Sequence, residues 1–187
     1  QDAQAAYEAG AIYGGLIFVE SSPRAVNEEK ARKVIAAAPL SYVGVFRNAD
    51  INDVAAKADA LSLSAVQLHG DEDQAYIDAL RHALAPQVQI WKAQSVGATL
   101  PARNLKHVDK YVLDNGQGGT GQRFDWSLLR GEVLDNVLLA GGLSPDNCVE
   151  AAKSGCAGLD FNSGVESQPG IKDPSKLASV FQTLRAY

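Results

Sequence analysis

The sequence predicts an α/β fold, a (β/α)8 TIM barrel whose first strand is absent from these 187 residues. Short apolar runs alternate with helical segments at a spacing of roughly two dozen residues, which is typical of a parallel sheet with crossover helices. The runs lack polar alternation, as expected for strands that are covered on both faces. Seven strands are expected in the chain and one more before it, which gives the eight strand–helix units of a barrel.

Seven apolar runs are expected to be strands. They span residues 11–19, 42–46, 65–69, 88–93, 111–114, 136–140 and 157–161. Helices are expected between them, within residues 27–39, 50–61, 71–84, 144–155 and 173–187. Residues 98–104 are less periodic and predict only a short helix, and residues 124–131 predict a turn or two.

The two C-terminal helical segments begin with similar signals. Asp173 is expected to cap the last helix, with Pro174 at its first position. Ser144 and Pro145 repeat this pattern one unit earlier, where Gly155 is the expected stop. Apolar residues recur at helical spacing in the last segment, at Leu177, Val180, Phe181 and Leu184.

The start of the chain decides the number of units. Residues 1–10 look like a helix closed by Gly10. A helix that leads into a strand of a regular repeat should itself follow a strand, so an eighth strand is expected upstream. Eight units close into a barrel, whereas a doubly wound open sheet is the alternative for seven. No linker or charge block divides the chain, so residues 1–187 are expected to be one domain.

Composition excludes several classes of partner. The net charge is −5 and no basic face is evident, so no nucleic-acid partner is expected. No apolar run has the length of a membrane span, and no signal-peptide pattern opens the chain. Cys148 and Cys156 have no nearby histidine, so no metal site is expected. Sparse thiols and these absences point to a cytoplasmic protein.

Most expected strands end in a polar residue or a glycine. A barrel of this kind places its chemistry at these ends. The residues concerned are Arg24, Asn48, His69, Lys92, Asp114, Gly141, Gly142, Asp160, Ser163 and Gly164. Gly141–Gly142 and Ser163–Gly164 follow the last two strands, where barrels commonly bind phosphate through backbone N–H groups. Ordinary turn glycines would explain either pair alone, but their joint position favours a phosphate site.

The glycines in the run 111–126 match G-x-G-x-x-G at Gly116, Gly118 and Gly121. A dinucleotide fingerprint should open a long helix early in a domain, and this one does neither, so no cofactor is expected. The glycines fit an active-site loop better. Asp114, just before them, is a candidate general acid because burial favours the proton-bearing form of a carboxyl group.

Four stretches, "VQLHGDE", "YVLDNGQGGTGQRFDW", "LLAGGLSPDN" and "LDFNSGVESQPGIKD", resemble phosphoribosylanthranilate isomerase over essentially all 187 residues. The likeness is strongest to the isomerase half of the enterobacterial bifunctional enzyme, which implies an N-terminal indole-3-glycerol-phosphate synthase domain as fused partner. It implies the barrel fold and an Amadori rearrangement in tryptophan biosynthesis. N-(5′-Phosphoribosyl)anthranilate would become 1-(2-carboxyphenylamino)-1-deoxyribulose 5-phosphate without metal or cofactor.

The resemblance also implies roles for single residues. Asp114 would protonate the furanose ring oxygen, and Arg24 would bind the anthranilate carboxylate through paired hydrogen bonds. Asp160 would lie in the substrate pocket. The phosphate would bind at Gly141, Gly142, Ser163 and Gly164. His69 would reach the mouth of the barrel, either as a substrate ligand or as a hydrogen-bonded structural histidine.

One departure from the family concerns the general base. The family begins with a strand that carries K-x-C-G, whose cysteine takes the C2′ proton, and this sequence starts after it. The 187 residues alone are therefore expected to be inactive. The alternatives are a non-catalytic phosphate-binding barrel and another phosphate-handling barrel, such as indole-3-glycerol-phosphate synthase or an aldose–ketose isomerase. A synthase should have lysine and glutamate at several strand ends, and Lys92 alone is not enough.

Overall fold

The computed structural model describes residues 1–116 and 123–187. The chain forms two compact units. The first comprises Ala3–Lys92 and Asn104–Asp109, and the second comprises Ala93–Arg103 and Lys110–Tyr187. Strand β4 (Gln89–Ser95) contributes residues to both.

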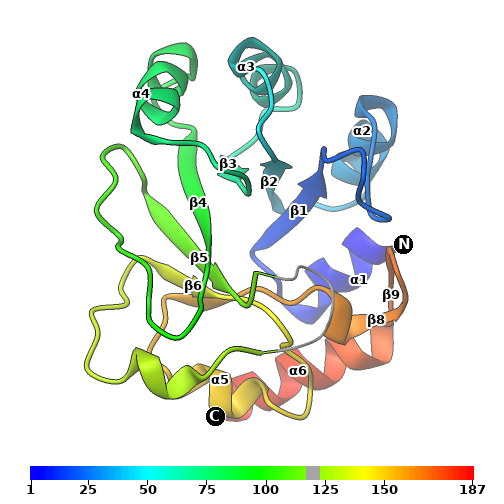
Figure 1. The fold of residues 1–187 in the computed structure, drawn as a ribbon. Helices are drawn as coiled ribbons and strands as arrows, with labels where there is room; N and C mark the ends of the chain where they lie inside the picture. Colours follow the sequence, from blue (N-terminus) through cyan, green and yellow to red (C-terminus); the bar gives the residue numbers. More distant parts are fainter. Residues whose placement is uncertain (117–122) are drawn as a thin grey trace. The chain divides into compact units, whose positions relative to one another are not determined.

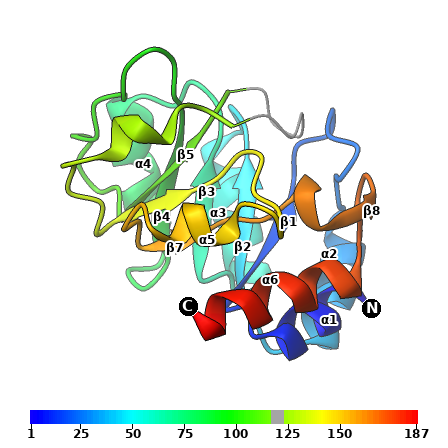
Figure 2. The same cartoon turned by 90° about the horizontal axis from the view of Figure 1, so that it is seen from below.

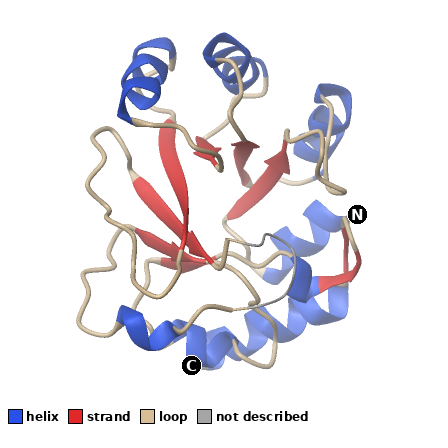
Figure 3. Ribbon diagram, viewed as in Figure 1, coloured by secondary structure: helices blue, strands red, loops and turns tan. Residues whose placement is uncertain are grey.

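In the first unit, parallel strands lie side by side in chain order. The strands are β1 (Tyr13–Ile17), β2 (Ser41–Phe46), β3 (Ala65–Leu68) and β4. Parallel neighbours need a crossover, usually a helix. Helices α2 (Glu28–Ala37), α3 (Ile51–Ala60) and α4 (Gln74–Ala83) supply the crossovers and lie on the same side of the strands (Figures 1 and 3).

Local sequence signals set the ends of these helices. The side chains of Asn27, Asp50 and Asp73 each accept hydrogen bonds from backbone N–H groups in the first turn of the helix that follows. Helix α1 (Asp2–Ala9) ends at Gly10, which has a left-handed φ of 105°, as predicted. The helix boundaries of this unit therefore follow from its sequence.

The core of the first unit lies between its strands and helices. Phe46, Leu68, Ile77 and Ile90 are fully buried there. A Cβ added to Gly44 would lie 2.7 Å from side-chain atoms of both Leu63 and Phe46, so this strand position has no space for a larger residue. Such burial on both faces explains why the strand runs are uniformly apolar.

In the second unit, three parallel strands again follow chain order. They are β5 (Lys110–Asp114), β6 (Val137–Leu139) and β7 (Gly158–Leu159). A 3-10 helix η1 (Trp126–Leu129) lies between β5 and β6 in the chain, α5 (Cys148–Ala152) between β6 and β7, and α6 (Pro174–Ala186) after them. Figure 2 shows α5 beside α6.

A second small sheet follows β7. A short 3-10 helix η2 (Ser163–Val165) leads into an antiparallel hairpin of β8 (Glu166–Gln168) and β9 (Ile171–Lys172). The sequence patterns did not predict this hairpin, because its strands are too short to show a hydrophobic period. Its Pro169–Gly170 turn is the one signal in the sequence that marks it.

The predicted strands, their parallel pairing and the cap of α6 at Asp173 are confirmed. Two local predictions are wrong. Residues 98–104 contain no helix. Helix α5 begins at Cys148 rather than after Ser144, because the Asn147 side chain accepts the Ser144 N–H at 2.9 Å and stabilises a turn at residues 145–147 instead. Among the described residues, none of the helices is long and apolar enough to cross a membrane.

Candidate functional site

Asp114 is the last residue of β5 and is only 6% exposed. The Gly116 N–H donates to its Oδ1 at 2.7 Å, and Gly116 has a left-handed φ of 77°. Adding a Cβ to Gly116 would bring that atom to 2.7 Å from the Ser95 Oγ. The tight turn after β5 thus requires glycine and holds the Asp114 carboxylate in one orientation.

The glycine pair after β6 lies against Asp114. Gly141 and Gly142 have φ values of 82° and 70°, which favour glycine. A Cβ on Gly141 would lie 3.4 Å from the Asp114 Cβ and 3.2 Å from the Asn115 nitrogen. The structure therefore brings the candidate acid and the first candidate phosphate loop together, as the strand-end pattern predicts.

The second candidate phosphate segment packs on the first. A Cβ on Gly164 would lie 1.9 Å from the Leu143 carbonyl oxygen, so the two backbones are in close contact. Ser163 and Gly164 begin η2, where the first N–H groups have no carbonyl of the same helix to bind. Two glycine-containing backbone segments thus lie together after β6 and β7.

Asp160 comes directly after β7, and its N–H donates to the Leu139 carbonyl at 2.8 Å. The residue is exposed. The backbone ladder of β6 and β7 thus continues to Asp160 and places it at the same strand edge as Gly141. Asp114, Gly141, Gly142, Asp160, Ser163 and Gly164 all belong to the second unit.

Arg24 and His69 belong to the first unit. Arg24 lies in a turn after β1, where its N–H donates to the Ser22 Oγ at 3.2 Å. His69 follows β3, and its N–H donates to the Phe46 carbonyl at 2.8 Å. The His69 Nδ1 lies 3.3 Å from the Gln67 Nε2. Both residues thus follow the carboxyl ends of their strands, as predicted.

The glycine-rich run and the two cysteines are the other features that the sequence singles out. Gly118, Gly119 and Gly121 of the glycine-rich run lie outside the described residues. Burial raises the pKa of the Cys156 thiol, and the Cys148 thiol donates to the Pro145 carbonyl at 3.4 Å. Both sulfurs are therefore poor candidates for a base. In the described ranges, no three His, Cys, Asp or Glu side chains gather as metal ligands would.

A family model for N-(5′-phosphoribosyl)anthranilate (PRA) isomerase matches residues 1–183. The chain belongs to this family. It is 75% identical over 187 residues to the tryptophan biosynthesis protein TrpCF of Salmonella typhi and 67% identical to that of Yersinia pestis. The matches cover all of this chain but 41% and 39% of those relatives, so the chain spans about two fifths of their length.

Solved PRA isomerases have a similar structure. The Thermus thermophilus enzyme superimposes with a TM-score of 0.86 at 30% identity, over 99% of this chain and 93% of that one. A PRA isomerase in complex with reduced 1-(o-carboxyphenylamino)-1-deoxyribulose 5-phosphate gives a TM-score of 0.80 at 29% identity, over 100% and 93%. The α/β architecture with consecutive parallel strands is therefore that of the family.

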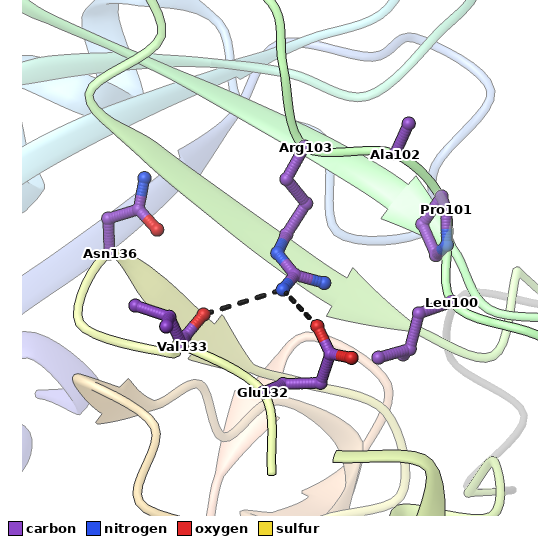
Figure 4. A pocket seen from close by; sticks show the side chains of 7 residues that line it. All are labelled: Leu100, Pro101, Ala102, Arg103, Glu132, Val133 and Asn136. Carbon is purple, nitrogen blue, oxygen red and sulfur yellow. Dashed lines mark hydrogen bonds and ion pairs between the residues drawn. The ribbon is translucent and has the colours of Figure 1, made fainter. Parts of the chain in front are cut away.

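A pocket in the second unit lies away from the strand ends just described. Figure 4 shows Arg103 between Glu132 and Val133, with its Nη2 donating to a Glu132 carboxylate oxygen at 2.9 Å and to the Val133 carbonyl at 3.4 Å. The lining residues are Leu100, Pro101, Ala102, Arg103, Glu132, Val133 and Asn136. These residues precede β5 and β6, whereas active sites of such folds follow the strands. We assign no ligand to this pocket.

Sequence reasoning missed a buried ion pair beside His69. The Lys92 Nζ donates to a Glu72 carboxylate oxygen at 2.9 Å, and their side chains are 7% and 1% exposed. Lys92 also donates to the carbonyls of Leu68 and Gly70, at 3.4 and 2.7 Å. The N–H groups of Asn48 and Gly70 donate to Glu72. This network fixes the backbone on both sides of His69.

The charge on Glu72 is stabilised in the folded protein. Burial alone would raise its pKa, but the N–H of Asn48 and the Lys92 ammonium group outweigh burial and lower the pKa below the ordinary 4.5. Burial and then the Glu72 charge raise the pKa of Tyr76 to about 12, and its hydroxyl donates to the Ala49 carbonyl. The Lys92–Glu72 pair therefore contributes to the stability of the folded protein when both groups are ionised.

We expect Lys92→Met to destabilise the protein by roughly 3–5 kcal/mol at neutral pH, because the Glu72 carboxylate stays buried without its cation. The double variant Glu72→Gln, Lys92→Met should recover part of this loss. Lys33→Met, which breaks the exposed pair with Glu29, is the matched control and should cost under about 1 kcal/mol. Urea unfolding measures all three, and an unchanged Lys92→Met midpoint would contradict the assignment.

The same variants test the pH dependence. A group whose pKa is lowered by folding adds stability above its unfolded pKa, and this stability is lost as the pH falls through the folded pKa. The difference in unfolding free energy between the wild type and the double variant should therefore be constant above about pH 5 and shrink below pH 4.5.

Proposed function

We propose that this chain is the isomerase part of a longer protein that catalyses the rearrangement of N-(5′-phosphoribosyl)anthranilate to 1-(2-carboxyphenylamino)-1-deoxyribulose 5-phosphate in tryptophan biosynthesis. The observation that carries the proposal is the family match over residues 1–183, together with a buried carboxylate that lies against a glycine loop after β6. The names of the TrpCF relatives agree with this pathway and favour a cytoplasmic location.

We infer that both units belong to one (β/α)8-barrel domain, residues 1–187, whose first strand precedes Gln1. The chain order of the parallel strands supports this inference, as does the coverage of solved isomerases. The partial coverage of the TrpCF relatives supports a fused partner, which we take to be an N-terminal indole-3-glycerol-phosphate synthase domain.

The general acid is proposed to be Asp114. It would transfer its proton to the furanose ring oxygen while the anthranilate nitrogen lone pair expels that oxygen, which leaves a C1′–N iminium. Removal of the C2′ proton then gives an enol that becomes the ketone. Asp114 gives one proton to the substrate and the base takes one from C2′. The enol then gains a proton at C1′ and loses its hydroxyl proton, so substrate and product are isomers and no redox partner is required.

The other site residues are proposed to bind the carboxylate, the sugar and the phosphate of the substrate. Arg24 is proposed to bind the anthranilate carboxylate, for which a planar guanidinium is well matched. Asp160 is proposed to contact the sugar, and His69 to contact the substrate or to order its loop. Gly141, Gly142, Ser163 and Gly164 are proposed to bind the phosphate through backbone N–H groups, which glycine leaves open to close approach.

The general base is proposed to be the cysteine of the strand that the family carries upstream of the position of Gln1. The surroundings of the two cysteines support this proposal, because the Cys148 thiol is buried and donates to the Pro145 carbonyl, and burial raises the pKa of the Cys156 thiol. The chain without that strand would bind ligand without turnover, which is the alternative function.

Asp114→Asn in the full-length protein should lower kcat by about 10²–10⁴-fold with little change in ligand affinity, because the amide keeps the shape but has no transferable proton. Steady-state kinetics and calorimetry measure the two effects. Asp135→Asn, an exposed residue before β6, is the matched control and should be neutral. Near-normal turnover of Asp114→Asn would remove Asp114 as the acid.

Arg24→Ala should weaken binding of the anthranilate-bearing product, while ribose 5-phosphate, which has no such carboxylate, should lose much less affinity. The expected loss is about 10–100-fold, the size of one charge-assisted contact. Arg32→Ala, an exposed residue of α2, is the control. Equal losses for both ligands would indicate a structural role for Arg24.

The base is tested with three polypeptides, namely residues 1–187 alone, the same chain with the family's N-terminal strand, and that extended chain with serine for its cysteine. An open barrel leaves unpaired strand edges, so the first should be the least stable, and it should be inactive. The second should be stable and active. The third should be stable but poorly active, because serine is a far weaker base near neutral pH. Full turnover by residues 1–187 alone would disprove the proposal.

A further inference from the structure

The Asn162–Gly164 segment is held from one side by a lysine on the following hairpin. The Lys172 Nζ donates to the Asn162 backbone carbonyl at 3.1 Å and to its side-chain Oδ1 at 2.8 Å. The next carbonyl, that of Ser163, accepts the Glu166 N–H. The Asn162 carbonyl also accepts the Val165 N–H of η2 at 3.3 Å, so Lys172 adds a second, cationic donor to it, and the Ser163 carbonyl is engaged by β8.

Because a peptide unit is planar, hydrogen bonds to these carbonyl groups also fix the direction of the Ser163 and Gly164 N–H groups. The Asn162 carbonyl and the Ser163 N–H belong to one planar peptide unit, as do the Ser163 carbonyl and the Gly164 N–H. The described residues contain no cis peptide bond, so each N–H points opposite to its carbonyl. Holding both carbonyls on the hairpin side directs the Ser163 and Gly164 N–H groups away from the hairpin.

Lys172 is itself held in place. Its Nζ lies 3.1 Å from a carboxylate oxygen of Glu166, whose side chain is 5% exposed and also accepts the Gly170 N–H. Glu166 and Lys172 face each other in the β8–β9 register. The Lys172 N–H donates to the Asp2 carboxylate at 2.9 Å. These contacts restrain the lysine at both its backbone and its ammonium group.

We propose that Lys172 is a positioning residue for phosphate binding, which acts by fixing the Asn162–Ser163 peptide unit that carries the Ser163 N–H group. The inference rests on the proposed function of this segment. Lys172 acts through the backbone of residues 162–164 rather than as the phosphate ligand, because its ammonium group is already bound to two oxygens of Asn162 and one of Glu166.

The test compares two ligands on the full-length protein by calorimetry. One is reduced 1-(o-carboxyphenylamino)-1-deoxyribulose 5-phosphate, and the other is its dephosphorylated form. Lys172→Met should raise the Kd of the phosphorylated ligand about 10- to 100-fold, the size of one misplaced backbone N–H bond to a charged phosphate oxygen, and leave the dephosphorylated ligand unchanged. Lys172→Arg, which keeps a cationic donor, should recover most of the affinity. In kinetics, Lys172→Met should raise KM far more than it lowers kcat.

Lys176→Met is the matched control, because the Lys176 Nζ donates to the Glu166 carbonyl of the same hairpin rather than to residues 162–164. It removes the same charge and should change the Kd of the phosphorylated ligand by less than about 2-fold. An equal loss in Lys176→Met would show a general effect of charge, and an equal loss for both ligands would show a general structural effect. Either result overturns the inference.

Two further outcomes are distinguishable. If thermal unfolding shows that Lys172→Met is not folded, Lys172→Leu makes the same comparison without a donor, and an unchanged Kd in that variant overturns the inference. A wild-type protein that binds neither ligand would disprove the proposed function itself, and the inference with it.

Discussion

Parallel pairing of consecutive strands is the constraint on which the candidate site depends. Each parallel neighbour requires a crossover, so the carboxyl ends of neighbouring strands fall at one edge. In the second unit the ladder continues to these ends, because Ala140 donates to the Leu113 carbonyl and Asp160 to the Leu139 carbonyl. Residues far apart in sequence, such as Asp114 and Gly141, thereby become neighbours. The backbone brings the functional groups together before any side-chain contact is made.

In both units, backbone carbonyls and N–H groups in the loops after the strands have no partner in the sheet and need other hydrogen-bond partners. The two units supply these partners in a similar way. In each, a lysine donates to backbone carbonyls and to a buried glutamate, and a glycine N–H donates to that glutamate. Lys92 and Glu72 do so beside His69, and Lys172 and Glu166 do so beside Ser163. A cation with several donors and an anion with several acceptors satisfy an irregular loop compactly.

Local signals predicted the strands and the α6 cap, because each depends on a few adjacent residues. The boundary of α5 could not be predicted this way, since Ser144 and Asn147 are both good caps and the choice depends on one hydrogen bond. The Lys92–Glu72 pair was also hidden, because its partners are 20 residues apart and meet only when β3 and β4 pair. The roles of Arg24 and His69 came from the family resemblance, as no sequence pattern assigns them.

The lysines of the two lysine–glutamate pairs differ in burial, and we expect their loss to have different effects on stability and on ligand binding. The Lys92 side chain is 7% exposed, and in its absence Glu72 would be a charge with little access to water, so its loss should affect the whole unit. The Lys172 side chain is 24% exposed. Water can therefore reach the Lys172 ammonium group, although the Glu166 side chain is only 5% exposed, and the proposal rests on the contacts of that group with the Asn162 carbonyl and Oδ1. The same arrangement of charges thus serves mainly the fold in the first unit and mainly the geometry of the ligand loop in the second.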